Sequence, residues 1–262
     1  MSVLLFVPGD RPERFVKAIE SGADAAILDL EDAVAPHRKR VARAAVREAL
    51  ERGLRAYVRI NPSGGDPGRA DLAELAGCAP LAVMLPKAAT ADDVAAVRRA
   101  LPGIPVVALI ESIDGLRQAD AIARAPGVAG LAFGAFDLCA ELGARPVAEV
   151  LAPLRSAVVV AARSAGVAAY DTPFLALEDE AGLVADARRA LDFGFDGKLA
   201  IHPKQVAPVR AIFTPSAEEL ERARAIVRAG HGGGVAVVDG AMVDAPIFAA
   251  ARRVLARAGE EQ

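Results

Sequence analysis

Two acidic residues of this sequence stand beyond apolar runs: Glu111 follows residues 106–110, and Asp137 lies shortly after residues 129–133. Both runs have the composition of buried parallel strands. In a barrel of alternating strands and helices, the C-terminal strand ends meet at one open mouth. Two carboxylates there, with water and substrate oxygens completing the shell, would suit Mg²⁺. Alternatively, each carboxylate is only ion-paired with Lys87 or Arg59, and position alone leaves both interpretations open.

Polar residues also follow nearly all of the remaining expected strands. They are Asp10 and Arg11, Asp29 to Asp32, Arg59 and Asn61, Lys87, Asp171 and His202. A packed barrel bottom would not need such a ring, whereas an active site assembled from several strand ends would. The ring predicts that the mouth carries the chemistry.

Two arginines are candidates for holding an anionic substrate. The guanidinium of Arg59 has the shape to grip a carboxylate with two parallel hydrogen bonds, and it stays charged when buried. Its alternative is a structural pair with Glu31 or Asp29. Arg11, in the Gly-Asp-Arg-Pro loop after the first strand, is a second anion-binding candidate, although Glu13 and Arg14 share its surface.

Lys87 and His202 invite other chemistries. A lysine desolvated at a barrel mouth can attack a carbonyl as a Schiff-base nucleophile. Glu111 on the next strand favours a protonated Lys87 instead, and so an electrostatic or structural role. His202 is either a general base or a hydrogen-bonded residue of a strand–helix junction.

The elements that must position these residues follow from the hydrophobic pattern. Eight short apolar runs alternate with segments of helical period, which predicts a (β/α)8 TIM barrel. The expected strands cover residues 3–7, 25–30, 56–60, 82–85, 106–110, 129–133, 167–170 and 197–201. An open doubly wound sheet is the alternative, but the first strand lacks a G-x-G-x-x-G turn, and the glycines at 232–234 follow a helix.

The chain continues past the eighth strand. We expect one TIM-barrel domain over residues 1–262, with the barrel at about 1–212 and a C-terminal helix–hairpin–helix arm at about 213–262. The arm would comprise a charged helix near 217–229, a strand pair around 235–242 and a last helix from Pro246. Asp239-Gly240 is the hairpin signal. Such an arm is typically a lid or an oligomer contact.

Composition narrows the partners. The formal charge of −3 over 262 residues indicates neither a nucleic acid nor an anionic membrane as partner. No apolar run approaches the ~20 residues of a membrane span, and we expect the first residues to form a strand, not a signal peptide. Cys78 and Cys139 show no Cys-x-x-Cys spacing, which favours buried thiols and a cytoplasmic setting over a disulfide or zinc.

Taken together, nine segments resemble the citrate lyase β-subunit family, the citryl-CoA and malyl-CoA lyase-like branch of the HpcH/HpaI aldolase/citrate lyase superfamily. They are LFVPGDRPER at 5–14, ILDLEDAV at 27–34, VRIN at 58–61, MLPKA at 84–88, ALIES at 108–112, FGAFDL at 133–138, GFDGK at 194–198, IHP at 201–203 and MVD at 242–244. Their order covers almost the whole chain, which makes the resemblance far more specific than any single motif.

The resemblance implies a Mg²⁺-dependent lyase that cleaves or forms a carbon–carbon bond between an acyl-CoA thioester and a 2-oxo acid. Glu111 and Asp137 match the metal ligands, and Glu111 would also contact substrate. Arg59 matches the anchor of the oxo acid or the developing enolate. Glu31 matches an acid that orients substrate or supports the metal. Asp244 matches a proton-exchanging acid delivered from a neighbouring subunit, which implies a homo-oligomer, specifically a trimer.

One position departs from the family pattern. Many relatives carry Gly-Ala-Glu-Asp at the metal ligand, whereas this chain has Phe136 before Asp137. Phe136 either packs under the helix or changes which acyl group is accepted. Two alternatives to a stand-alone lyase follow: the β-subunit of a multi-subunit citrate lyase that acts on a carrier-protein thioester, and a non-catalytic barrel that binds metal and 2-oxo acid.

Overall fold

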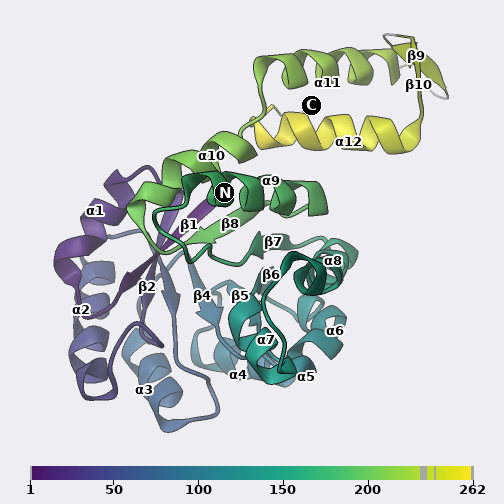
Figure 1. Cartoon of the computed structure of the whole chain (residues 1–262). Helices are drawn as coiled ribbons and strands as arrows, with labels where there is room; N and C mark the ends of the chain where they lie inside the picture. The colour runs from purple at the N-terminus through teal and green to yellow at the C-terminus, as the bar shows by residue number, and fades with distance from the viewer. Residues whose placement is uncertain (1, 231–234, 239, 261–262) are drawn as a thin grey trace. The chain divides into compact units, whose positions relative to one another are not determined.

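Eight parallel strands form a closed barrel in the computed structural model, which describes residues 2–230, 235–238 and 240–260. Each strand pairs with its neighbour in chain order, and β8 returns to pair with β1 (Figure 1). The strands are β1 Val3–Pro8, β2 Ala25–Asp29, β3 Tyr57–Arg59, β4 Ala82–Leu85, β5 Val106–Ile110, β6 Val128–Phe133, β7 Ala168–Asp171 and β8 Gly197–Ala200. The predicted (β/α)8 barrel is confirmed, with every predicted strand in place.

The barrel interior is filled by side chains. Alternate residues of the strands form one buried cluster, which includes Leu4, Ile27, Met84, Leu109 and Leu199. Because successive strand residues point to opposite faces, the residues between them are left to meet the outer helices. This two-sided burial explains why the strands read as continuous apolar runs.

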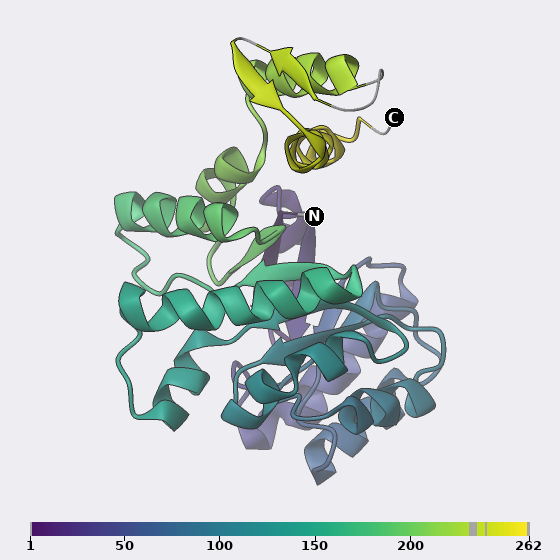
Figure 2. The same ribbon diagram turned by 90° about the vertical axis from the view of Figure 1, so that its right-hand side faces the viewer.

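Helices surround the barrel between its strands (Figure 2). They are α1 Phe15–Glu20, α2 Lys39–Glu51, α3 Asp66–Leu75, α4 Ala91–Ala100, α5 Ile113–Arg117, α6 Ala119–Ala123, α7 Ala135–Leu142, α8 Ala148–Ala165, α9 Glu180–Phe193 and α10 Val206–Phe213, with short 3-10 helices η1 Pro12–Arg14, η2 Pro36–Arg38 and η3 Pro203–Gln205. In α2, Ala42, Val46 and Leu50 are buried at four-residue spacing, which gives the helix one apolar face. Thr90 and Asp93 form a capping box that begins α4.

The chain divides into two compact units, Met1–Val209 and Arg210–Gln262, and the second follows the barrel in the sequence. The second unit contains α11 Ala217–Ala229, the strands β9 Ala236–Val238 and β10 Ala241–Val243, and α12 Ala245–Arg257. The two strands are antiparallel, so the predicted helix–hairpin–helix arm is present. Its own small core brings Phe248 and Leu255 of α12 against Ile226 and Val227 of α11.

Asp239 of the hairpin signal and the glycines at 232–234 lie outside the residues that the structure describes. Within the described part of the chain, no helix combines the length and the apolar character that crossing a membrane requires.

Candidate active site

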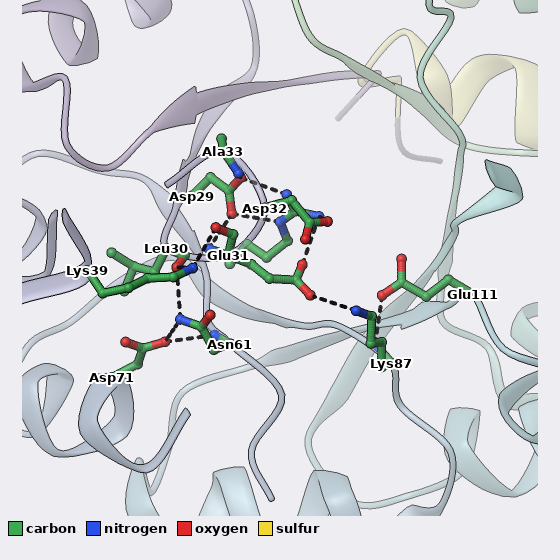
Figure 3. Close-up of polar contacts among 11 residues, drawn as sticks. Asp29, Leu30, Glu31, Asp32, Ala33, Lys39, Asn61, Asp71, Lys87 and Glu111 are labelled. Atoms are coloured by element: carbon green, nitrogen blue, oxygen red, sulfur yellow. Dashed lines mark hydrogen bonds and ion pairs between the residues drawn. The ribbon is translucent and has the colours of Figure 1, made fainter. Parts of the chain in front are cut away.

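Strand ends of the barrel bring Glu31, Arg59, Lys87 and Glu111 into one polar cluster (Figure 3 shows three of them labelled). Arg59 Nη1 lies 3.0 Å from Glu31 Oε2, and Lys87 Nζ lies 3.6 Å from Glu31 Oε1. The backbone N–H of Lys87 donates a 2.8 Å hydrogen bond to Glu111 Oε1. These residues follow or end β2, β3, β4 and β5, which are consecutive in the barrel.

Arg59 is held on three sides. Its Nε and Nη2 donate hydrogen bonds of 2.7 and 2.6 Å to the two oxygens of Asp29, and its guanidinium carbon lies 4.7 Å from the centre of the Phe6 ring. Burial works to lower the pKa of Arg59, but the hydrogen bonds and charge of Asp29 raise it above its ordinary value. The structural pair with Asp29 and Glu31 therefore exists: Asp29 holds Nε and Nη2, and Nη1 lies beside Glu31 and 3.6 Å from Asp32 Oδ2.

The loop that carries Glu31 is fixed through its backbone. Lys39 Nζ donates to the carbonyl oxygens of Leu30 and Glu31 at 2.6 and 2.7 Å, and Asn61 Nδ2 donates to Leu30 O at 2.8 Å (Figure 3). Asp29 Oδ1 accepts the N–H of Glu31 at 2.9 Å. These hydrogen bonds engage the backbone of the loop and not the carboxylate of Glu31.

The Glu31 carboxylate is buried and incompletely satisfied. Only 4% of the residue is exposed, and neither oxygen accepts a hydrogen bond from the described residues, although Arg59 and Lys87 lie within ion-pair distance. Burial raises the pKa of Glu31 to about 7, with Asp32 and Asp29 adding to the rise against the opposing charges of Arg59 and Lys87. Such a carboxyl group lacks a partner that a cation or a substrate hydroxyl would provide.

Glu111 is also buried, with 5% of the residue exposed. Burial raises its pKa to about 8, the charges of Glu31 and Asp137 add to the rise, and the N–H of Lys87 and the charge of Arg59 work against it. Glu111 also packs tightly against Gly134 after β6, where an added Cβ would stand 2.3 Å from Glu111 Cβ. Gly134 therefore gives Glu111 the room that any other residue would occupy.

The remaining predicted residues differ in their placement. Asp137 lies exposed in the first turn of α7, close enough for its charge to act on Glu111. Arg11 is exposed on the loop after β1, where its Nε lies 4.0 Å from Asp10 Oδ1, so its ion-pair neighbour is Asp10 and not a residue of the cluster. Asp244 stands at the start of α12 in the second unit, where its carbonyl accepts the N–H of Phe248.

The contacts of Lys87 and His202 favour the electrostatic or structural alternatives over a Schiff base and a general base. The charges of Glu31 and other nearby acids outweigh burial and raise the pKa of Lys87 above its ordinary value, which keeps its ammonium protonated and disfavours a Schiff base. His202 caps the start of η3, where its Nδ1 accepts the N–H of Lys204 at 3.1 Å. That nitrogen is thus occupied in a junction contact.

Asp171, expected in the ring at the mouth, is instead used within the protein. It is fully buried and pairs with Arg155 of α8 at 2.9 Å and with Lys198 of β8 at 2.7 Å, and both cations also contact Asp186 of α9. The lysine inside a strand, Lys198, was the signal in the sequence for this buried pair.

Phe136 is not packed beneath α7. It is 36% exposed and lines a cavity of about 430 Å³ together with Leu151, Phe174 and Leu175. Its effect on the choice of acyl group stays a prediction.

The donor set fits Mg²⁺ in its chemistry. Among the residues that the structure describes, no three His, Cys, Asp or Glu side chains form a metal cluster by themselves. Mg²⁺ is characteristically bound by one or two carboxylates, with water and substrate oxygens completing the octahedron. Glu111 and Asp137 supply that number, and the raised pKa of Glu111 and the unsatisfied Glu31 oxygens mark a site with too little positive charge.

The chain is similar to known proteins in sequence and in fold. Residues 2–203 match the model of the family described as HpcH/HpaI aldolase/citrate lyase. The chain is 39% identical to a (3S)-malyl-CoA thioesterase of Cereibacter sphaeroides over 266 residues, which cover 97% of this chain and 93% of the relative.

Two solved structures from Mycobacterium tuberculosis are similar in fold and sequence. The protein CitE in complex with magnesium, acetoacetate and coenzyme A superposes with a TM-score of 0.86 at 40% identity, covering 99% of this chain and 98% of that one. A citrate lyase β subunit complexed with oxaloacetate and magnesium has a TM-score of 0.75 at 40% identity, with coverage of 81% and 96%. The chain belongs to the HpcH/HpaI aldolase/citrate lyase family.

Proposed function

We propose that this protein is a Mg²⁺-dependent carbon–carbon lyase. It cleaves, or in reverse forms, a 3-hydroxyacyl-CoA thioester such as citryl-CoA or malyl-CoA, and the products are an acyl-CoA and a 2-oxo acid such as oxaloacetate or glyoxylate. The observation that carries the proposal is the convergence of buried Glu31 and Glu111 with Arg59 at adjacent strand ends. Structures of similar proteins, one with magnesium and oxaloacetate and one with magnesium, acetoacetate and coenzyme A, support it.

Glu111 and Asp137 would hold the metal. When bound, Mg²⁺ supplies positive charge for the oxygens of the hydroxy acid or the oxo acid and for the charge that develops on bond cleavage. Glu111 would also face substrate, and Glu31 would orient the substrate with a carboxyl group whose pKa of about 7 lets it exist in either protonation state near neutrality.

Arg59 would stabilise charge that is absent in the ground state. Cleavage of the bond moves an electron pair onto the thioester carbonyl and leaves an enolate. A guanidinium already fixed by Asp29 and Phe6 requires little rearrangement when that charge appears. Its Nη1 edge, which lies beside Glu31, would meet the oxo acid or the enolate, and Arg11 would contact the substrate from the loop after β1.

Asp244 would exchange the proton at the thioester carbon from the arm of a neighbouring subunit. This role makes the enzyme a homo-oligomer, with a trimer as the proposed state, and makes barrel and arm parts of one lyase domain. The composition supports a cytoplasmic location.

The decisive assay supplies purified protein with citryl-CoA or malyl-CoA and Mg²⁺ and detects the 2-oxo acid together with the acyl-CoA. Formation of both products in equal amounts is expected. Absence of both, with Mg²⁺ binding confirmed, would exclude the lyase. Co-purification of a carrier subunit would point to the multi-subunit citrate lyase, and Mg²⁺-dependent binding of oxaloacetate without any thioester turnover would point to the non-catalytic barrel.

A second candidate activity is thioester hydrolysis, which the likeness to the (3S)-malyl-CoA thioesterase favours. The two activities differ in their products from malyl-CoA: the lyase yields acetyl-CoA and glyoxylate, whereas hydrolysis yields malate and free CoA thiol. A thiol reagent present during the reaction therefore separates them, because only hydrolysis releases thiol in proportion to the malyl-CoA consumed.

A further inference from the structure

Lys87 has an unusual backbone conformation. Its φ of 50° makes it the one non-glycine residue with positive φ in the part of the chain that the structure describes. Side chains other than glycine, asparagine and aspartate seldom occupy this left-handed region, and strain of this kind is found where the surroundings or the function require it. The strained residue follows β4, at the mouth of the barrel.

The conformation places the amide of Lys87 on Glu111. Lys87 N donates to Glu111 Oε1 at 2.8 Å, and Figure 3 shows this contact beside the separate one between the Lys87 ammonium and Glu31. The ammonium is less constrained, because half of the side chain is exposed and its nearest carboxylate oxygen lies 3.6 Å away. The closer contact to Glu111 thus comes from the main chain.

Gly134 holds Glu111 from the other side. A Cβ at residue 134 would stand 2.7 Å from Glu111 Oε2 as well as 2.3 Å from Glu111 Cβ. The φ of Gly134 is −101°, which other residues adopt, so space and not backbone conformation explains the glycine. Since β4 and β6 are the two neighbours of β5, Glu111 stands between the ends of both.

We propose that Lys87 acts through its main chain as a positioning residue for Glu111: its left-handed backbone aims the amide at Oε1, and together with Gly134 it orients the carboxylate for metal binding. The ammonium is secondary in this role. The proposal rests on the proposed function, in which Glu111 holds Mg²⁺.

Three variants of Lys87 separate backbone from charge. Lys87→Gly and Lys87→Asn remove the ammonium but tolerate the left-handed conformation, whereas Lys87→Val removes it and disfavours that conformation. Mg²⁺ binding to the metal-free full-length proteins is measured by calorimetry, with circular dichroism to confirm the fold. We expect the Gly and Asn variants to bind within about twofold of the wild type, and the Val variant to bind ~10-fold or more weakly, the usual effect of losing a group that orients a ligand.

Equal affinities of all three variants would overturn the proposal, because they would show that the backbone conformation of residue 87 does not set Mg²⁺ affinity. Gly134→Ala tests the opposite side of Glu111 and should weaken Mg²⁺ binding at least as much as Lys87→Val does. A Gly134→Ala protein that is folded and binds normally would remove Gly134 from the proposal.

Glu111→Gln distinguishes failure of this inference from failure of the proposed metal site. If Glu111→Gln binds Mg²⁺ like the wild type, the metal site is wrong. Crystal structures of the metal-free Gly and Val variants then still decide the positioning: the residue-87 amide should stay within hydrogen-bond distance of Glu111 Oε1 in the Gly variant and lose that contact in the Val variant. Retention of the contact in both would overturn it.

Discussion

At the residue scale, Glu31 and Glu111 are carboxyl groups for which burial outweighs the nearby positive charges. Their pKa values are raised to about 7 and about 8, in both cases chiefly by burial. A raised folded-state pKa means that the metal-free protein retains protons there above pH 4.5, where an unfolded glutamate loses them. Magnesium prefers the ionised carboxylates, so metal and protons compete for this site.

We therefore predict that Mg²⁺ affinity rises with pH from about 6 to about 8 and levels off above that, by up to ~10-fold per pH unit for each proton displaced. Calorimetry in two buffers with different ionisation enthalpies would measure the protons released at pH 7. A pH-independent affinity with no proton release over this range would contradict the prediction.

The same shift predicts a stability effect in the absence of metal. Below pH 4.5 Glu111 is protonated in both the folded and unfolded states. Its destabilising effect grows between pH 4.5 and its folded pKa of about 8 and is constant above that pKa. Glu111→Gln, which keeps an acceptor for the Lys87 N–H, should therefore stabilise the metal-free protein by ~2 kcal/mol at pH 8.5. Urea denaturation at pH 8.5 and pH 5 would test this, because the gain should largely vanish at pH 5.

Arg59 gives a third prediction, in which charge and shape are separated. Arg59→Lys keeps the charge but loses the paired hydrogen bonds to Asp29, and kcat should fall by ~100-fold or more, as for other fixed donors to a developing oxyanion. Arg59→Met leaves the fully buried Asp29 without its partner and should cost ~3–5 kcal/mol of stability. Steady-state kinetics and denaturation of both variants measure the two effects, and a Lys variant with wild-type kcat would refute the role of the fork.

The mouth residues show what a sequence pattern can and cannot predict at this scale. Glu31, Arg59 and Glu111 were identifiable because each follows or ends an apolar run. Asp171 follows an apolar run too, but it pairs with Arg155 of α8, and this contact between a strand and a helix is not visible in the local pattern. The left-handed Lys87 and the packing of Gly134 on Glu111 depend on contacts between neighbouring strand ends, and the local pattern carries no sign of them.

At the element scale, a buried ion network joins the last helices and strands of the barrel. Lys198 Nζ donates to Asp171 Oδ2 at 2.7 Å, to Asp186 Oδ2 at 2.6 Å and to the carbonyl of Thr172 at 2.6 Å. It thereby links β8 with β7 and α9, while Arg155 links α8 to the same two acids. Strands and helices were predictable from periodicity. Of their cross-links, the sequence signals only Lys198, a lysine inside a strand, and not the acids and helices that it joins.

We predict that Lys198→Met destabilises the protein by ~3–5 kcal/mol, because two acids lose a buried partner. The matched control is Arg124→Met directly after α6, where Arg124 pairs with Asp120 at 3.0 Å on the exposed surface. That variant should leave the denaturation midpoint almost unchanged. Similar losses for both variants would show that burial of the network is unimportant.

At the scale of the whole molecule, the proposed reaction needs residues from two compact units. Glu111 and Arg59 belong to the unit Met1–Val209, and Asp244 belongs to the unit Arg210–Gln262. The sequence resemblance implies that the arm of a neighbouring subunit supplies Asp244. If each site combines the barrel of one subunit with the arm of another, two inactive variants that fail in different units can complement each other.

Asp244→Asn and Glu111→Gln should each abolish turnover when assayed alone, since one lacks the proposed proton-transfer acid and the other a proposed metal ligand. A co-expressed mixture of the two, isolated as mixed oligomers by two affinity tags, contains sites with an intact barrel from one variant and an intact arm from the other. In a mixed trimer one of the three sites combines an intact barrel with an intact arm, so we expect about a third of wild-type activity. Light scattering of the same sample measures the subunit number. Mixed oligomers without activity would show that Asp244 acts on the barrel of its own chain or has no catalytic role. If the Asp244→Asn protein is active by itself, Asp244 has no catalytic role.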